Sequence, residues 1–190
     1  MTAGKWSSSG QIAEIVRQCL EEGKTVEIDG LGTFRPTARR GFKFWPTNRP
    51  KVFLAYVQED ARSVDRLFNA LAEQGFDPWM DRRKLMPGQN WPRSIEEAID
   101  NSNFFVACFS CQSVGKKGGF QAEIRYALEC ARRVPLDDIF IIPVRLDDCR
   151  IPGRIQKELH YIDLYPDWRR GLQRLFSVIE RQVTRHAKKP

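Results

Sequence analysis

The sequence predicts an α/β fold in which a parallel sheet of five strands carries helices on both faces. Beyond residue 49, short apolar segments alternate with amphipathic ones, and the connections between them are short. The segment NFFVACF (103–109) is nearly all apolar, which is typical of a strand covered on both faces. Residues 1–48 predict a separate small module, a helix followed by a β-hairpin. The segment FWPTNRP, with two prolines and an asparagine, predicts a linker before a second domain at 49–190.

Five segments of the second domain predict strands: KVFLAY (51–56), FDPWM (76–80), NFFVACF (103–109), DIFIIPVRL (138–146) and YIDLY (161–165). Helices are expected at 60–75, 91–102, 118–131 and 167–183, with a short one within 151–160. Asp60 is a candidate cap for the first helix, Gly75 ends it, and Pro78 favours an edge strand. This order predicts a flavodoxin-like sheet, in which ligands bind beyond the carboxyl ends of the strands.

Composition indicates a folded soluble protein, with 42% hydrophobic and 29% charged residues in a chain of 190. No apolar run approaches the roughly 20 residues of a membrane-spanning helix, so we expect a cytoplasmic protein without a membrane partner. The net charge of +7 lies largely near the C-terminus and suits nucleic acid, an anionic ligand or plain solubility. The pair Cys108 and Cys111 is expected to be two buried thiols rather than a metal site.

The segment GGFQAEIRYALECA (118–131) contains one carboxylate, Glu123, next to an inward-facing position. An acidic residue in the first turn of a helix is an ordinary helix-start signal. The predicted topology, however, places Glu123 on the rim where ligands bind. The sequence has no Gly-rich phosphate loop and no evident Ser-His-Asp set, so any chemistry on this rim falls to carboxylates.

Five motifs in order, KVFLAYVQED, GFDPWMDRRKLMPGQNW, IEEAIDNSNFFVACFS, GGFQAEIRYALECA and IFIIPVRLDD, resemble the Toll/interleukin-receptor (TIR) domain family, in particular its bacterial members. The resemblance covers about residues 51–183. It implies a five-stranded flavodoxin-like sheet and one of two activities, cleavage of NAD⁺ or non-enzymatic assembly with other TIR domains. It implies that Glu123 is catalytic. It also implies substrate-binding positions (Tyr56, Asp81, Lys84, Leu85, Trp91 and Phe120) and an assembly loop (Arg82, Arg83, Pro87 and Gly88).

The chemistry of NAD⁺ suits a single carboxylate. Nicotinamide leaves the ribose as a neutral group, and a glutamate can stabilise the oxocarbenium-like cation that forms. NAD⁺ is then a substrate, and no cofactor or metal is expected. Lys84 is a candidate for a phosphate partner, and Trp91 either stacks on a ring or staples the next helix. The sequence departs from the family pattern at Gly119, where enzymatic members often have tryptophan, and at Val57 and Gln58, where many have arginine directly after the tyrosine.

Residues 10–45 resemble a fragment of the histone-like (HU/IHF) DNA-bending family, without its long basic arm. Arg39 and Arg40 are candidate contacts to DNA phosphates. The alternative, which we favour, is a small clip that packs on the TIR domain or mediates self-association. Three functions follow: an NAD⁺ glycohydrolase or ADP-ribosyl cyclase in antiphage defence that is activated by self-association, a TIR scaffold that binds other TIR domains or defence proteins, and a DNA-associated protein.

Overall fold

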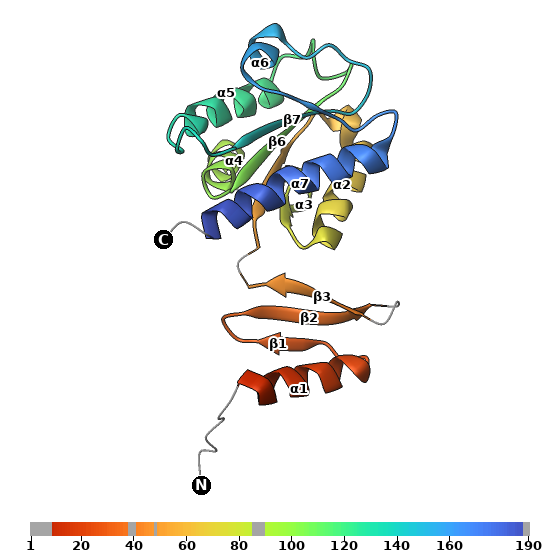
Figure 1. Cartoon of the computed structure of the whole chain (residues 1–190). Coiled ribbons are helices and arrows are strands. Elements are labelled where there is room, and N and C mark those ends of the chain that lie inside the picture. The colour runs from red at the N-terminus through yellow and green to blue at the C-terminus, as the bar shows by residue number, and fades with distance from the viewer. Residues whose placement is uncertain (1–8, 38–40, 48, 85–89, 188–190) are drawn as a thin grey trace. The chain divides into compact units, whose positions relative to one another are not determined.

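The structure is a computed structural model that describes residues 9–37, 41–47, 49–84 and 90–187. The chain forms two compact units, Met1–Arg49 and Pro50–Pro190 (Figure 1). Within the described ranges, none of the helices combines the length and the apolar character that crossing a bilayer requires.

The larger unit contains the predicted five-stranded parallel sheet. Its strands are β4 (Lys51–Ala55), β5 (Asp77–Trp79), β6 (Phe104–Phe109), β7 (Ile141–Arg145) and β8 (Ile162–Asp163). They lie in the order β5-β4-β6-β7-β8, and every neighbouring pair is parallel. The predicted α/β fold class is therefore confirmed. Pro78 lies in β5, an edge strand, where the missing N–H group breaks no central ladder.

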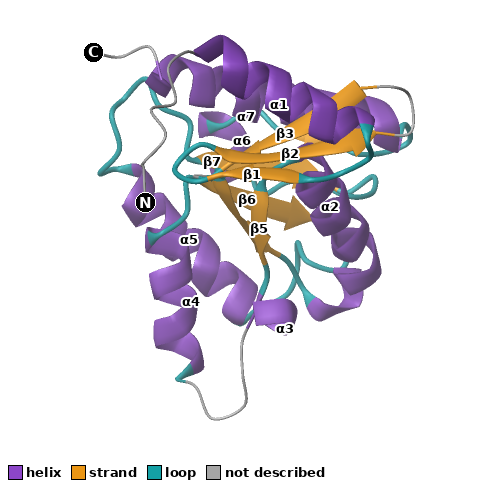
Figure 2. Ribbon diagram, turned by 90° about the horizontal axis from the view of Figure 1, so that it is seen from below, coloured by secondary structure: helices purple, strands orange, loops and turns teal. Residues whose placement is uncertain are grey.

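Helices cover both faces of this sheet. On one face, the core packs beneath α2 (Ala61–Gln74) and α7 (Trp168–Ala187). On the other face it packs beneath α4 (Trp91–Asp100), α5 (Gly119–Ala131) and α6 (Gly153–Glu158), with α4 and α5 side by side (Figure 2). The strand β6 between them is buried along its whole length, as expected for a strand covered on both faces.

Several local predictions needed correction. The segment after β5, predicted as a loop, begins with a short helix, α3 (Asp81–Lys84), and a 3₁₀ turn, η1 (Gln58–Asp60), precedes α2. Asp60 occupies the cap position of α2 without a side-chain cap hydrogen bond. Gly75 does end α2, at a φ of 101° that favours glycine.

The smaller unit consists of α1 (Ser9–Glu21) and an antiparallel sheet of β1 (Val26–Ile28), β2 (Gly32–Thr37) and β3 (Gly41–Pro46). The sequence predicted two strands here, and the structure has three. β1 pairs with β2 around a turn at Asp29–Leu31, where Gly30 has a φ of 73°, and β2 pairs with β3.

Candidate functional site

Tyr56 and Asp81, two predicted substrate-binding residues, meet at the carboxyl end of the sheet. Tyr56 directly follows β4, and Asp81 begins α3, two residues after β5. The Tyr56 hydroxyl donates a hydrogen bond to Oδ1 of Asp81 at 2.7 Å, and the Arg82 N–H donates to the same oxygen at 2.6 Å. Burial, together with the bond to Asp81, raises the pKa of Tyr56 well above its ordinary value. The protonated phenol therefore fixes the Asp81 carboxylate at this rim.

Glu123 lies on α5, half-buried, close enough to Asp81 for the two charges to interact. Burial raises the pKa of Glu123 to about 7, and the negative charge of Asp81 adds to the shift. Within the described part of the chain, no cation offsets this shift. Near neutral pH the carboxyl group therefore exchanges readily between its protonated and charged forms.

The start of α5 excludes the helix-start explanation for Glu123. The helix begins at Gly119, with Gly118 as the cap residue, so that Glu123 is the fifth helical residue and lies beyond the first turn. The favourable effect of the helix dipole on an acidic residue is confined to that first turn. A half-buried carboxylate beyond the first turn costs the fold free energy, and ionisable groups perturbed in this way cluster at functional sites.

Two neighbours of Glu123 on α5 have different environments. Phe120 is only 6% exposed, and its ring packs edge-to-face on Phe109 at the end of β6, with a centroid distance of 5.6 Å. This burial makes Phe120 an anchor for the start of α5, and the ring belongs to the core in this structure. A Cβ added at Gly119 would meet only Oε1 of Glu123, at 3.9 Å. The Glu123 side chain thus extends toward Gly119.

A polar network that the sequence analysis missed supports the loop leading into α5. The buried Ser110 hydroxyl donates to Oδ2 of Asp60 at 2.5 Å, and the Ser113 hydroxyl accepts from the Ser110 N–H at 2.8 Å. Lys116, in the same loop, forms an ion pair with Glu59, which neighbours Asp60. Burial raises the pKa of Asp60 above its ordinary value. The signal was two serines three residues apart directly after a buried strand, a pattern typical of side-chain-stabilised turns.

The predicted assembly residues Arg82 and Arg83 are both held on α2. Each forms an ion pair with Asp65, and the pair from Arg83 measures 2.8 Å. The Arg83 guanidinium also donates to Asn69 at 3.2 Å and lies 4.3 Å from the centre of the Phe68 ring. These contacts fix α3 against α2, and with it the position of Asp81.

The remaining predicted residues are either exposed or lie outside the described part of the chain. Lys84 is exposed and lies 3.9 Å from Asp77, a loose ion pair that leaves its ammonium group accessible. Trp91 begins α4 and is 60% exposed, so little of its ring packs against the helix as a hydrophobic staple would. Other predicted positions (Leu85, Pro87, Gly88, Arg39 and Arg40) lie outside the described residues.

The cysteine pair after β6 differs from the prediction of two buried thiols. Cys108 is buried, whereas Cys111 is exposed in the following turn. Among the residues that the structure describes, no group of three or more His, Cys, Asp or Glu side chains is arranged to hold a metal ion.

A five-stranded parallel sheet with a half-buried carboxylate at its carboxyl rim defines a flavodoxin-like domain with a candidate functional site at that rim. The model of the TIR domain family matches residues 52–176. This chain therefore belongs to the TIR domain family. The resemblance of residues 10–45 to the HU/IHF family lies outside that match and stays a prediction.

Solved structures share this fold at low sequence identity. The TIR domain of the Toll-related receptor TRR-2 from Hydra magnipapillata is 22% identical, with a TM-score of 0.52 over 73% of this chain and 98% of that chain. The TIR domains of the activated Roq1 resistosome are 20% identical, with a TM-score of 0.54 over 68% and 99%. A prokaryotic SEFIR domain is 18% identical, with a TM-score of 0.52 over 68% and 98%. These likenesses show the fold.

The protein y4cD of Sinorhizobium fredii is 28% identical to this chain over 139 residues. The match covers 72% of this chain and 21% of that protein, so this chain spans about a fifth of the length of this curated relative.

Proposed function

We propose that this TIR domain cleaves the bond between nicotinamide and ribose in NAD⁺, with Glu123 as the catalytic residue. The observation that carries the proposal is the half-buried Glu123 carboxyl group, whose pKa of about 7 is raised by burial and by Asp81. Perturbed carboxylates of this kind concentrate at sites of chemistry. Membership of the TIR family and the position on the ligand-binding rim of the sheet support the same proposal.

The proposed reaction needs one carboxylate and water. The bond between C1′ of the ribose and the nicotinamide nitrogen breaks, and its electron pair leaves with nicotinamide, which becomes neutral. The ionised Glu123 stabilises the positive charge that develops on the ribose ring, as a carboxylate does in glycoside hydrolysis. Water adds to C1′ and loses a proton, so the products are ADP-ribose, nicotinamide and H⁺. If an adenine nitrogen adds instead of water, the product is cyclic.

Other residues of the rim take supporting roles in the proposal. Asp81 accepts hydrogen bonds from ribose hydroxyls in this proposal, and the 2.7 Å hydrogen bond from Tyr56 that holds its carboxylate at the rim supports this role. The accessible ammonium group of Lys84 suits a phosphate of the substrate, and the exposed Trp91 ring suits stacking. The proposal includes activation by self-association of TIR domains, in which α3 and the segment after it take part, in a setting of antiphage defence.

The test is to incubate the purified full chain with NAD⁺, with and without a crowding agent that promotes assembly, and to measure free nicotinamide. Replacing Glu123 with glutamine should reduce the initial rate at least about 100-fold, since an amide cannot supply the negative charge. The matched control is Glu129→Gln, an exposed glutamate on the same helix, which should retain the full rate.

Full activity in Glu123→Gln would remove the catalytic assignment. An inert wild-type chain under both conditions would favour the alternative, a scaffold that binds other TIR domains.

A further inference from the structure

The smaller unit, Met1–Arg49, has almost no interior of its own. Among the residues of this unit whose burial the structure describes, only Gly32 is buried, whereas Ile12 is 47%, Leu31 50% and Phe42 59% exposed. With 49 residues, the unit is close to the size of about 40 residues below which domains usually need disulfides, metals or oligomerisation to fold. Its one cysteine, Cys19, is not in a disulfide, and its described residues form no metal-binding group.

The register of the small sheet gathers apolar side chains on one face. Val26 pairs with Phe34, which pairs with Phe44, and Pro36 pairs with Phe42. Directly opposed residues share a face, so all five project to the same side. The Phe34 ring lies 4.5 Å from the Phe44 ring and 5.6 Å from the Phe42 ring, measured between centroids. These contacts form an aromatic row across β2 and β3.

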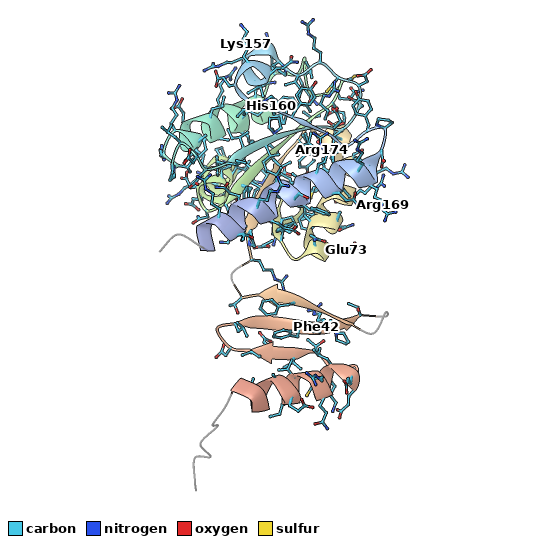
Figure 3. The ribbon with its side chains drawn as sticks, in the orientation of Figure 1. Phe42, Glu73, Lys157, His160, Arg169 and Arg174 are labelled. Atoms are coloured by element: carbon cyan, nitrogen blue, oxygen red, sulfur yellow. The ribbon has the colours of Figure 1, made fainter. Side chains whose placement is uncertain are left out.

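Helix α1 covers only part of this face. It packs on β1 and β2, while on β3 Phe42 remains 59% and Phe44 37% exposed. The position of Phe42 on the sheet can be followed in Figure 3. A groove of about 960 Å³ lies between α1 and the sheet, with Phe34 and Phe42 among its lining residues.

We infer that a second copy of this chain covers the groove, so that two small units share one core. A two-fold contact sets each residue of one copy against the same set in the other. The groove wall carries both Arg17 and Glu21, and such a pair of opposite charges is complementary to itself across a two-fold axis.

The size of the exposed apolar face fits this occupant. Four large apolar side chains of this face are partly exposed: Ile12, Leu31, Phe42 and Phe44. Their exposed parts amount to on the order of 400 Å² per copy, if each side chain contributes roughly 200 Å² when fully exposed. A stable interface buries about 800 Å² from each partner, and a little over half of that area is apolar. The face therefore supplies the apolar part of an interface of ordinary size.

The experiment measures the mass of the full chain in solution by sedimentation equilibrium over a dilution series. The wild-type chain should have twice the 22.1 kDa of one chain at tens of micromolar and should dissociate on dilution. Phe42→Lys should weaken association about 100-fold or more, because it places a charge in the centre of an apolar contact. Ile12→Lys, at a half-exposed position of α1 that lines the same groove, should do the same with little effect on the fold of one copy.

The matched control is Thr33→Lys, which places the same charge on the opposite face of β2 and should leave the dimer intact. A wild-type chain that stays monomeric at 100 micromolar would overturn the inference. A dimer that resists both Phe42→Lys and Ile12→Lys would overturn it as well, because another surface would then hold the copies together. If Phe42→Lys disrupts folding, as judged by circular dichroism, Ile12→Lys alone decides. The mass measurement does not depend on NAD⁺ cleavage, so the two proposals fail separately.

Discussion

The charge on Glu123 should destabilise the protein in a manner that depends on pH. The pKa of this carboxyl group is about 7 in the folded protein and about 4.5 in an unfolded chain. Between these values the folded state binds more protons than the unfolded state, so the free energy of unfolding falls as the pH rises from 4.5 to 7. Above pH 7 the loss is complete, because both states are then ionised. Replacing Glu123 with glutamine removes this loss.

The expected size of the effect follows from the same values. A shift from 4.5 to about 7 corresponds to about 3 kcal/mol at 1.36 kcal/mol per unit, and partial exposure reduces it to about 2–3 kcal/mol. Glu123→Gln should therefore be more stable than the wild type by that amount at pH 8 and by less than about 1 kcal/mol at pH 5. For a chain of this size the difference at pH 8 corresponds to a rise in Tm of roughly 5–10 °C.

Thermal unfolding followed by circular dichroism at pH 5, 6, 7 and 8 measures this difference. The control Glu129→Gln removes an exposed carboxylate from the same helix, and its Tm should follow that of the wild type at every pH. If the gain in Tm of Glu123→Gln over the wild type is no larger at pH 8 than at pH 5, the carboxyl group is not buried at a cost, and the electrostatic reasoning about the site is wrong. No substrate is involved, so the outcome does not depend on which reaction the protein catalyses.

Three further predictions concern the site and its support. The initial rate of NAD⁺ cleavage at low substrate concentration should rise about tenfold from pH 6 to pH 8 with a midpoint near 7, because only ionised Glu123 stabilises the cation; a flat profile would contradict this role. Tyr56→Phe should lower the free energy of unfolding in urea by about 1–2 kcal/mol, because the part-buried bond to Asp81 is lost, and an unchanged value would mean that the bond is not formed. Gly171→Ala should destabilise the larger unit by about 1–3 kcal/mol, because the new Cβ would lie 2.4 Å from a backbone oxygen of β8, whereas Gly153→Ala, with open space at its Cβ, should be neutral or slightly stabilising in the same urea titration.

The fold of the larger unit could be predicted because its strands and helices carry strong and separate patterns. The segment at 103–109 is uniformly apolar and forms β6, and the i, i+3, i+4 spacing at 60–75 forms α2. The proline at position 78 also predicted that its strand lies at the edge of the sheet, because an edge strand tolerates proline. Such signals are local and can be recognised in one sequence.

The details of the site depend on contacts between distant segments, which a single sequence does not show. Asp60 has the residue type of a helix cap, yet its carboxylate accepts a hydrogen bond from Ser110, fifty positions away. The packing of the Phe120 ring on Phe109, between α5 and the end of β6, is another contact that the sequence does not show. The helix containing Glu123 was predicted to within one residue of its observed start, but Glu123 was counted in the first turn, whereas it is the fifth helical residue and its burial carries a cost.

The two units of this protein share an energetic property despite their different architectures. Each contains a feature that is unfavourable in the isolated chain: a half-buried carboxylate without a compensating cation in the described part of the larger unit, and an apolar face that α1 covers only in part in the smaller one. A ligand that relieves such a feature binds more tightly in consequence, because binding removes a cost that the free protein bears. The positively charged nicotinamide ring of NAD⁺, and the cation that follows its departure, would relieve the first, and the apolar face of a second copy would relieve the second. Neither feature contributes to the stability of one free chain, which is why we attribute both to binding rather than to folding.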